Sequence, residues 1–268
     1  MRLLGVYRER VFSPGKVRED AAILEAALIE LSHRGHEFHL VAPEALDRTA
    51  ADHACVLTMA QSARALVMLE ELESRGTKVI NSVASVRNCF RKPLIRLLIE
   101  AGLPLPRSRI MATVGAEEEI YSEMAFPCWI KRGDVHAVEA RDVARVASSE
   151  ELGEAIRHFR DRRIETLLVQ EHIEGEVIKF YGVGSSGYFS AFLPSTGEEI
   201  TSRSDELCRI GRRAAEAAGL DIYGGDAIAT PEHALALIDL NDWPSFSRCC
   251  GSAAAAIARY VAAILEGD

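Results

Sequence analysis

The stretch IDLNDWP at positions 238–244 and the earlier stretch YGGDAI at positions 223–228 each carry oxygen-bearing side chains in or after an apolar run. Side chains on a strand alternate between its two faces, so Asp239 and Asn241 point the same way while Leu240 points into the core. If the two runs pair as neighbouring strands, Asp226 lies beside Asp239 and Asn241, and three hard oxygen donors converge at one place. Such a set suits Mg²⁺ that bridges nucleotide phosphates. A polar turn after a buried strand is the alternative, because Asp, Asn and Pro are common in turns.

The composition is that of an ordinary globular protein. Of the 268 residues, 48% are hydrophobic and 26% charged, which excludes a disordered or fibrous protein. The formal net charge of −9 argues against a general nucleic-acid-binding protein, which needs a broad cationic surface. Basic residues nevertheless dominate the segment 75–110, where Glu100 is the single acid. A small anionic ligand such as a nucleotide suits this patch, and a solvated helix face is the alternative.

The six cysteines are scattered, and neither their spacing nor that of the histidines indicates a zinc site. This usage is typical of reduced cysteines, so we expect a cytoplasmic protein in which Cys249 and Cys250 serve packing. The charged positions 8–10 follow the N-terminus too closely for a signal peptide. No apolar run approaches the roughly 20 residues that a membrane helix needs, so we expect no membrane partner.

Strand and helix patterns alternate through the first 81 residues. Apolar runs at 2–7, 37–42, 55–59 and 78–81 predict strands, and residues 17–31 and 63–75 space their apolar side chains as helices do. This alternation predicts a small parallel sheet with helices on both faces, which binds ligands in the loops at its strand ends. The loop after the first strand carries four basic residues and could hold an anionic substrate; an ordinary surface loop is the alternative. These residues are Arg8, Arg10, Lys16 and Arg18.

Three stretches in the middle of the chain suit nucleotide binding. Lys92 precedes Pro93, which favours the first position of a helix, so Lys92 would lie near helix N-terminal amides that attract anions. Lys131 ends a predicted strand, and the turn at 132–137 after it could cover phosphates with its amides or be a plain hairpin. The apolar strand 167–173 then offers main-chain groups that could bind an adenine, followed by acids that could take the ribose hydroxyls.

In this order the motifs resemble those of the ATP-grasp superfamily. The resemblance rests on Lys92 before AGLPLP (101–106), FPCWIKRG (126–133), LLVQEHIEG (167–175), and YGGDAIA (223–229) followed by ALALIDLNDWP (234–244). It covers about residues 85–241. It implies an α/β protein with an ATP-grasp fold and a Rossmann-like pre-ATP-grasp domain at 1–84. The ATP-grasp module at 85–268 would consist of a nucleotide lobe at about 105–173 and a metal lobe at about 174–268.

The resemblance also implies Mg-ATP, with two magnesium ions, and a role for each matching residue. Lys131 and Lys179 would be the catalytic side chains, and Lys92 and Lys131 would contact the ATP phosphates. The adenine hinge would consist of Gln170, Glu171, His172 and Ile173, with Glu174 or Glu176 facing the ribose. The metal ligands would be Asp226, Asp239 and Asn241.

The branch of the superfamily is predicted from fewer residues. The stretches VQEHIEGEVIKFYGVG (169–184), IYGGDAI (222–228) and IDLNDWPSF (238–246) are most similar to the ATP-grasp inositol polyphosphate kinases, which carry a lysine after the hinge and Asp-x-Asn-x-x-Pro at the metals. Ser245 stands where those kinases have glycine. This resemblance implies transfer of the γ-phosphate of ATP to a small anionic or polyol acceptor. The residues that would bind the acceptor are Lys16, Arg18, His136, Lys179 and Ser245.

Two alternatives stay open. One is a carboxylate-amine or carboxylate-thiol ligase that acts through an acyl phosphate; the glutamate ligases of that group have Glu-x-Asn where this chain has Asp239-Leu240-Asn241. The other is a nucleotide-binding protein without turnover, against which the three candidate metal ligands argue. The sequence leaves the identity of the acceptor and the oligomeric state open.

Overall fold

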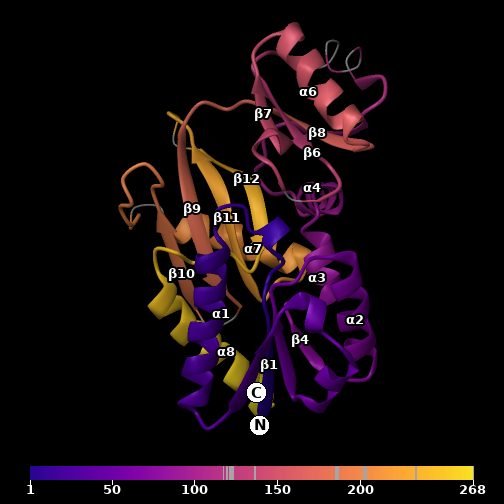
Figure 1. The fold of residues 1–268 in the computed structure, drawn as a ribbon. Helices are drawn as coiled ribbons and strands as arrows, with labels where there is room; N and C mark the ends of the chain where they lie inside the picture. Colours follow the sequence, from indigo (N-terminus) through magenta and orange to yellow (C-terminus); the bar gives the residue numbers. More distant parts are fainter. Residues whose placement is uncertain are drawn as a thin grey trace.

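The described part of the chain folds into three four-stranded sheets with helices packed against them (Figure 1). The computed structural model describes residues 1–267 apart from 117, 119, 121–123, 136, 185–186, 202–203 and 233. His136, a predicted substrate-binding residue, therefore lies outside the described residues. The first sheet is formed by the N-terminal part of the chain. The second sheet comes next in the sequence and lies in the upper lobe of Figure 1, and the third sheet is formed by the part of the chain after the second.

The first sheet is parallel, with strand order β2-β1-β3-β4. Its strands are β1 (Arg2–Val6), β2 (Glu37–Val41), β3 (Cys55–Thr58) and β4 (Lys78–Ile80), with helices α1 (Val17–Ser32) and α2 (Ala63–Ser74) between them. Every residue of β3 is buried, as expected for an inner strand of a parallel sheet covered on both faces. The loops contain the short 3-10 helices η1 (Arg10–Phe12), η2 (Pro43–Ala45) and η3 (Arg48–Asp52).

Two helices connect this sheet to the next, and the second begins earlier than the sequence predicted. They are α3 (Val83–Asn88) and α4 (Arg91–Glu100). Pro93 is the third residue of α4 rather than its first. Proline is tolerated there because the first amides of a helix have no partner within the helix. Lys92 consequently lies inside the first turn and not ahead of it.

The second sheet is antiparallel, with order β5-β8-β6-β7. It consists of β5 (Ser108–Ala112), β6 (Cys128–Arg132), β7 (Val143–Val146) and β8 (Thr166–Glu171), with the 3-10 helix η4 (Ala140–Asp142) before β7. Helix α6 (Ser149–Asp161) packs on it through the buried Leu152, Ile156 and Phe159. Ser148 caps this helix by accepting a hydrogen bond from the amide of Glu151.

The third sheet is also antiparallel, with order β10-β9-β11-β12. Its strands are β9 (Glu176–Val183), β10 (Tyr188–Phe192), β11 (Ile222–Ala229) and β12 (Leu235–Asp242). Helix α7 (Ser204–Ala218) buries Leu207, Ala214 and Ala215 in the same core as Phe180 of β9. The pairing of β11 with β12 that the sequence suggested is present.

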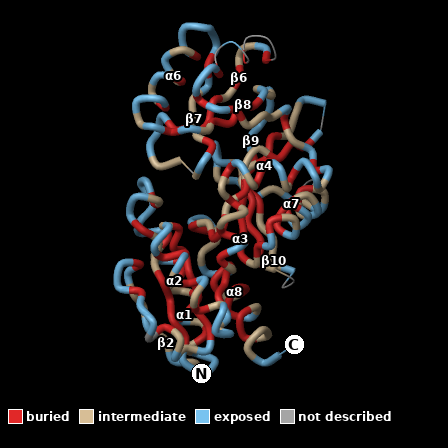
Figure 2. The backbone as a smooth tube through the Cα atoms, turned by 90° about the vertical axis from the view of Figure 1, so that its right-hand side faces the viewer, coloured by how far each residue is buried: buried red, intermediate tan, exposed pale blue. Residues whose placement is uncertain are grey.

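The last helix, α8 (Cys250–Glu266), lies beside α1, and both chain termini lie at the lower end of Figure 1. One buried core joins the first sheet to the third. It contains residues of β1, α1 and α8 together with Tyr181 of β9 and Trp243, which directly follows β12. Figure 2 shows many buried residues (red) in the lower part of the molecule, where α1 and α8 are labelled. The division of the chain at residue 84 stays a prediction, because this core joins the two parts. None of the helices in the described part of the chain is long and apolar enough to cross a bilayer.

Asn81 joins the first sheet to the third. Its side-chain amide donates to the carbonyl of Ile222 at 2.7 Å, and its carbonyl oxygen accepts from the amides of Asp221 and Ile222 at 2.9 and 2.8 Å. Asn81 is 0% exposed, so all three hydrogen bonds are shielded from water. They fix the start of β11, the strand that carries Asp226, against the end of β4.

We expect Asn81→Ala to lower the free energy of unfolding by about 2–4 kcal/mol, because it leaves buried polar groups of the backbone without partners. Urea denaturation followed by circular dichroism measures this. Asn88→Ala is the matched control, since Asn88 is half-buried and its side chain makes a single hydrogen bond, to Ala218. Equal stability losses in the two variants would contradict the role given to Asn81.

Candidate active site

Three charged side chains form a row across neighbouring strands of the third sheet. The register pairs Lys179 of β9 with Asp226 of β11, and Asp226 with Asp239 of β12. The Lys179 ammonium donates to Asp226 Oδ1 at 2.5 Å. A β-bulge follows Asp226, so that Ala227 pairs with Leu237 and Ile238 is left over. Bulges re-aim the chain locally, and the carbonyl of Ile238 at this bulge accepts a hydrogen bond from Lys131 of the second sheet.

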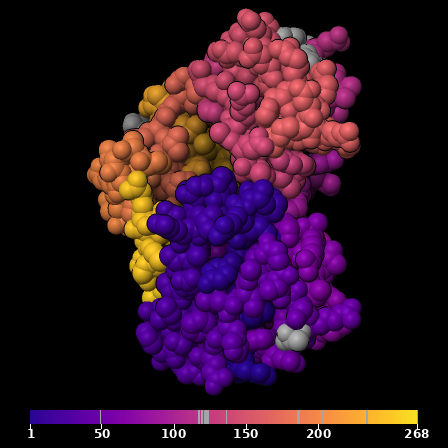
Figure 3. Space-filling model, in the orientation of Figure 1, coloured from indigo at the N-terminus to yellow at the C-terminus, as the bar shows by residue number. Residues whose placement is uncertain are grey.

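A cavity of ≈ 290 Å³ lies between the second and third sheets, and both Asp226 and Asp239 line it. Figure 3 shows the molecular surface hollowed where the upper lobe meets the orange strands. The cavity combines charged groups with the apolar side chains of Trp129, Val143, Ile173, Val177, Ile228 and Ile238. Apolar walls with a few convergent polar groups are the usual setting of a small-molecule site.

Lys131 of β6 enters this cavity and connects the two lobes. Its ammonium donates to Gln170 Oε1 at 2.7 Å and to the carbonyl of Ile238 at 3.3 Å. The side chain is buried, with 7% of the residue exposed. Burial lowers the pKa of Lys131 to about 8, while the carboxylate of Asp239 opposes this shift. Binding of an anion beside the ammonium would restore its charge.

Arg91, which the sequence analysis did not single out, lines the cavity, whereas Lys92 does not. Arg91 is 4% exposed, and its guanidinium lies 3.8 Å from Asp239 Oδ1. Its Nε has no hydrogen-bond partner among the described residues. The side chain of Lys92 is exposed, and its main-chain amide donates to Gly133. Arg91, and not Lys92, therefore lies where a side chain could reach a phosphate in this cavity, and the phosphate contact itself stays a prediction.

We expect Arg91→Ala to weaken binding of ADP and ATP by about tenfold or more, since a charge-assisted contact to phosphate is lost. Lys92→Ala is the matched control one residue along the same helix, and we expect it to change affinity less than twofold. Isothermal titration calorimetry of both variants measures the difference. A larger effect in Lys92→Ala would restore the sequence-based prediction.

The predicted hinge lines the cavity, but Gln170 plays a different part in it. Gln170 is 1% exposed, and its side-chain amide donates to Ser108 Oγ at 2.9 Å while its oxygen accepts from Lys131. It thus orients the lysine. The amide of Glu171 donates to the carbonyl of Arg107, whereas the amides of His172 and Ile173 have no backbone partner among the described residues. The latter two remain available to an adenine.

The acids after the hinge differ in position. Glu174 lines the cavity and accepts a hydrogen bond from His172 Nε2 at 2.9 Å, and His172 Nδ1 in turn faces Trp129 Nε1 at 3.1 Å. Glu176 is exposed and does not line the cavity. Of the two acids that the sequence offered for the ribose, the structure brings only Glu174 to the cavity.

The three predicted metal ligands lie on two adjacent strands. Asp226 faces Asp239 in the register, and Gly224 faces Asn241. Burial raises the pKa of Asp226, and the ammonium of Lys179 opposes this shift. A nearby cation would likewise favour the ionised form. In the described part of the chain, no three His, Cys, Asp or Glu side chains come together as a metal site. The donors present fit Mg²⁺, which proteins commonly hold through one or two carboxylates together with substrate phosphates.

A second cavity, of ≈ 230 Å³, lies on the other side of Lys179. Lys16, Lys179, Asn241 and Ser245 line it, so four predicted residues come together there. Arg18 is exposed and lies outside both cavities. The bare backbone of Gly224 and Gly225 also lines the second cavity. Because Lys179 is paired with Asp226 of the first cavity, the two cavities adjoin at this ion pair.

Arg8 belongs to the loop after the first strand that the sequence offered for an anionic substrate, and it lines the second cavity. Its guanidinium donates to the carbonyls of Met59, Asp242 and Trp243 at 3.2, 3.1 and 2.7 Å, and lies 3.6 Å from Asp20 Oδ2. Arg8 thereby fastens the loop after β1 to the end of β12.

Comparisons with known proteins concern the fold as a whole. The structure resembles the RimK-domain ATP-grasp protein of Sphaerobacter thermophilus with a TM-score of 0.75 and 25% identity, over 98% of this chain and 100% of that one. It also resembles the D-Ala:D-Ser ligase VanG of Enterococcus faecalis (TM-score 0.76, 12% identity, 98% and 99% covered). A third neighbour is the D-alanine–D-alanine ligase of Bacillus anthracis complexed with ATP (TM-score 0.76, 12% identity, 99% of each chain).

In sequence, no protein-family model matches. The formate-dependent phosphoribosylglycinamide formyltransferase of Yersinia enterocolitica is 32% identical over 110 residues, which is 40% of this chain and 28% of that protein. The chain thus matches about a quarter of this relative's length.

The protein belongs to the ATP-grasp superfamily. The α/β class and the ATP-grasp fold that the sequence predicted are confirmed by the full-length structural matches. The two ligases at 12% identity speak for the fold alone.

Proposed function

We propose that this protein is an ATP-dependent ligase that joins a carboxylate to an amine or a thiol through an acyl phosphate. The observation that carries the proposal is the row Lys179, Asp226 and Asp239 at the border of two adjoining cavities. Such a border suits transfer of a phosphoryl group from a nucleotide in one cavity to an acceptor in the other. This chain shares its fold with two proteins named as ligases, and for that reason we propose ligation rather than the kinase reaction.

In the first cavity, ATP would bind with its adenine against Trp129 and Ile173 and its phosphates near Arg91 and Lys131. The amides of His172 and Ile173, which have no backbone partner in the part of the chain that the structure describes, would bind the base, and Glu174, which lines the cavity, would bind the ribose. Magnesium held by Asp226, Asp239 and Asn241 would neutralise charge on the phosphates. Lys131, Lys179 and Arg91 would provide positive charge where negative charge increases during phosphoryl transfer. Such electrostatic stabilisation is the main contribution that a protein makes to this chemistry.

In the second cavity, Lys16, Lys179 and Arg8 favour an anionic acceptor. A carboxylate oxygen of the acceptor attacks the γ-phosphorus, the bond from this phosphorus to the β–γ bridging oxygen breaks, and ADP leaves. The amine or thiol then attacks the acyl carbon, and phosphate leaves with the carboxylate oxygen that made the first attack. Lys179 would hold the carboxylate in line and Ser245 would contact its far side, so that positioning supplies much of the rate.

A kinase is the second candidate, and the residue type at Asp239 supports it. The sequence has Asp239-Leu240-Asn241 followed by Pro244, the pattern that resembles the inositol polyphosphate kinases. With the same site, a hydroxyl would attack the γ-phosphorus in place of a carboxylate. The comparisons favour the ligase, so the kinase is the less supported reading.

Phosphorus NMR of the purified protein with Mg-ATP tests the proposal. One pool of acceptors contains amino acids, short peptides and other carboxylates with amines and thiols; the other contains polyols and inositol phosphates. We expect ADP and free phosphate in equal amounts only when a carboxylate and an amine or thiol are both present. A new phosphoester signal would make the protein a kinase. Tight ATP binding with no ADP in either pool would indicate a binding protein without turnover.

A further inference from the structure

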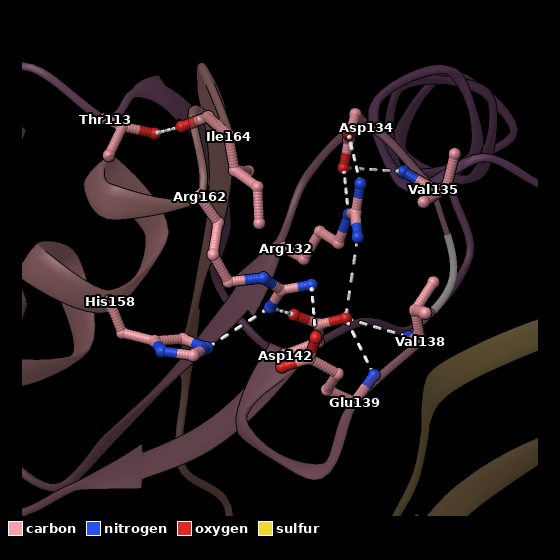
Figure 4. Close-up of polar contacts among 10 residues, drawn as sticks. All are labelled: Thr113, Arg132, Asp134, Val135, Val138, Glu139, Asp142, His158, Arg162 and Ile164. Atoms are coloured by element: carbon pink, nitrogen blue, oxygen red, sulfur yellow. Dashed lines mark hydrogen bonds and ion pairs between the residues drawn. The ribbon is translucent and has the colours of Figure 1, made fainter. Parts of the chain in front are cut away.

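Asp142 is a carboxylate buried at the end of the loop that follows Lys131. It is 0% exposed, and its Oδ2 accepts hydrogen bonds from the amides of Val138 and Glu139 at 2.8 and 3.0 Å. Its Oδ1 pairs with the guanidinium of Arg162, from the turn after α6. Figure 4 shows the carboxylate at the centre of these contacts. The far end of the loop is therefore tied to one side chain.

The near end of the same loop is tied to the same network. Arg132, the residue after Lys131, pairs with Asp134 at 2.5 and 2.9 Å, and Asp134 Oδ1 also accepts from the amide of Val135 at 3.0 Å. The guanidinium of Arg132 lies 3.7 Å from Asp142 Oδ2. Both ends of the segment from Arg132 to Glu139 thus meet at Asp142, as the dashed contacts in Figure 4 show.

This segment leaves and rejoins the wall of the first cavity. Lys131, directly before it, and Val143, directly after Asp142, both line that cavity. Gly133 is bonded on both sides: its amide donates to Thr166 at 2.8 Å, and its carbonyl accepts from the amide of Lys92 at 3.1 Å. A displacement of the segment would therefore move the cavity wall next to Lys131.

Charge strengthens the anchor. Burial alone would raise the pKa of Asp142, but the Arg162 hydrogen bond and the amides of Glu139 and Val138 lower it, so the carboxylate stays ionised at neutral pH. Hydrogen bonds to an ionised acceptor are stronger than those between neutral groups. Replacing the carboxylate by an amide removes one acceptor oxygen and turns an N–H group toward Arg162 or toward a backbone amide.

We propose that Asp142 is a positioning residue for nucleotide binding, which holds the segment 132–139 and so fixes the cavity wall beside Lys131. The inference rests on the proposed function only in that the first cavity binds a nucleotide. Asp142 does not line the cavity, so its effect on the nucleotide passes through the segment.

The test compares Asp142→Asn with Asp161→Asn, a control at an exposed position of the same lobe. We expect Asp142→Asn to raise the dissociation constant of ADP about tenfold and the KM for ATP to a similar degree, with kcat little changed. Hydrogen–deuterium exchange of residues 132–139 should be faster in this variant without nucleotide. Asp161→Asn should match the unchanged protein in each measurement. A structural role alone would reduce the active fraction, and hence kcat, and leave KM unchanged.

Arg162→Gln is the second variant, because it removes one contact of the anchor and keeps the Asp142 carboxylate. That carboxylate still accepts hydrogen bonds from the amides of Val138 and Glu139 and lies 3.7 Å from Arg132. This variant decides the question if Asp142→Asn does not fold. Unchanged ADP affinity and unchanged exchange in a folded variant would overturn the inference while leaving the proposed function intact. If the unchanged protein bound neither ADP nor ATP, the proposed function itself would fail, and this inference with it.

Discussion

Lys131→Met is expected to weaken binding of ADP and ATP by about 30- to 100-fold and to abolish measurable turnover. The ammonium is the buried positive charge that joins Gln170 on one lobe to the carbonyl of Ile238 on the other. Removing it deletes a charge-assisted contact to phosphate, which is worth about 2–3 kcal/mol, and one link between the lobes. Methionine has a similar shape and no charge to bury, so the fold should persist. Calorimetric titration with ADP measures the loss.

The pH dependence of binding gives a separate check on the same residue. The pKa of Lys131 is lowered from 10.5 to about 8, so the amine loses its charge as pH rises through about 8. We expect nucleotide affinity to fall over that range, and binding at pH 8.5 to take up part of a proton because phosphate restores the charge. Between pH 8 and 10.5 the unfolded chain binds more protons at this position than the folded chain, so this group alone makes stability rise with pH. Proton uptake that persists in Lys131→Met would contradict the assignment.

Asp239→Ala is expected to reduce kcat by about 10³-fold with the fold intact. Asp239 faces Asp226 across the strand pair and lines the cavity, so its loss removes one of the two carboxylates that fit a magnesium ion. It also removes a negative charge 3.8 Å from Arg91. In EDTA, we therefore expect the variant to bind ADP as tightly as the unchanged protein, or more tightly. Mg²⁺ should increase the ADP affinity of the unchanged protein but not that of the variant.

Titrations of ADP with and without Mg²⁺ separate these two effects. Asp205→Ala, at the start of α7 and away from both cavities, is the control. Full turnover of Asp239→Ala with Mg²⁺ would remove Asp239 from the metal site. Weaker ADP binding in EDTA would instead mean that the carboxylate supports the nucleotide directly.

Residue patterns along single strands could be predicted from the sequence. The alternation in IDLNDWP placed Asp239 on the cavity side, and the paired run YGGDAI brought Asp226 opposite it. These positions depend on a period of two and on the pairing of neighbours, which short apolar runs already indicate. The bulge after Asp226 gives no such signal, so the bond from Lys131 to the carbonyl of Ile238 could not be foreseen.

Positions that depend on the phase of a helix or on contacts between strands were harder to predict. The sequence suggested that α4 begins at Pro93, and Lys92 was therefore predicted to contact phosphate. The helix begins instead at Arg91, and the side chain of Arg91 lines the cavity. One residue along a helix rotates a side chain by about 100°, which is enough to exchange buried for exposed. Gln170 was predicted as a hinge residue, but a buried polar side chain within an apolar strand needs a partner, and here the partner is Lys131.

The central claim is that a carboxylate of the acceptor attacks ATP. Its most direct test uses the carboxylate that supports turnover, labelled with ¹⁸O in both oxygens, together with Mg-ATP, the amine or thiol, and the protein. Phosphorus NMR resolves phosphate that contains ¹⁸O from phosphate that does not. The acyl-phosphate route predicts one ¹⁸O atom in each phosphate released. Unlabelled phosphate, or a stable phosphoester in place of free phosphate, would contradict it.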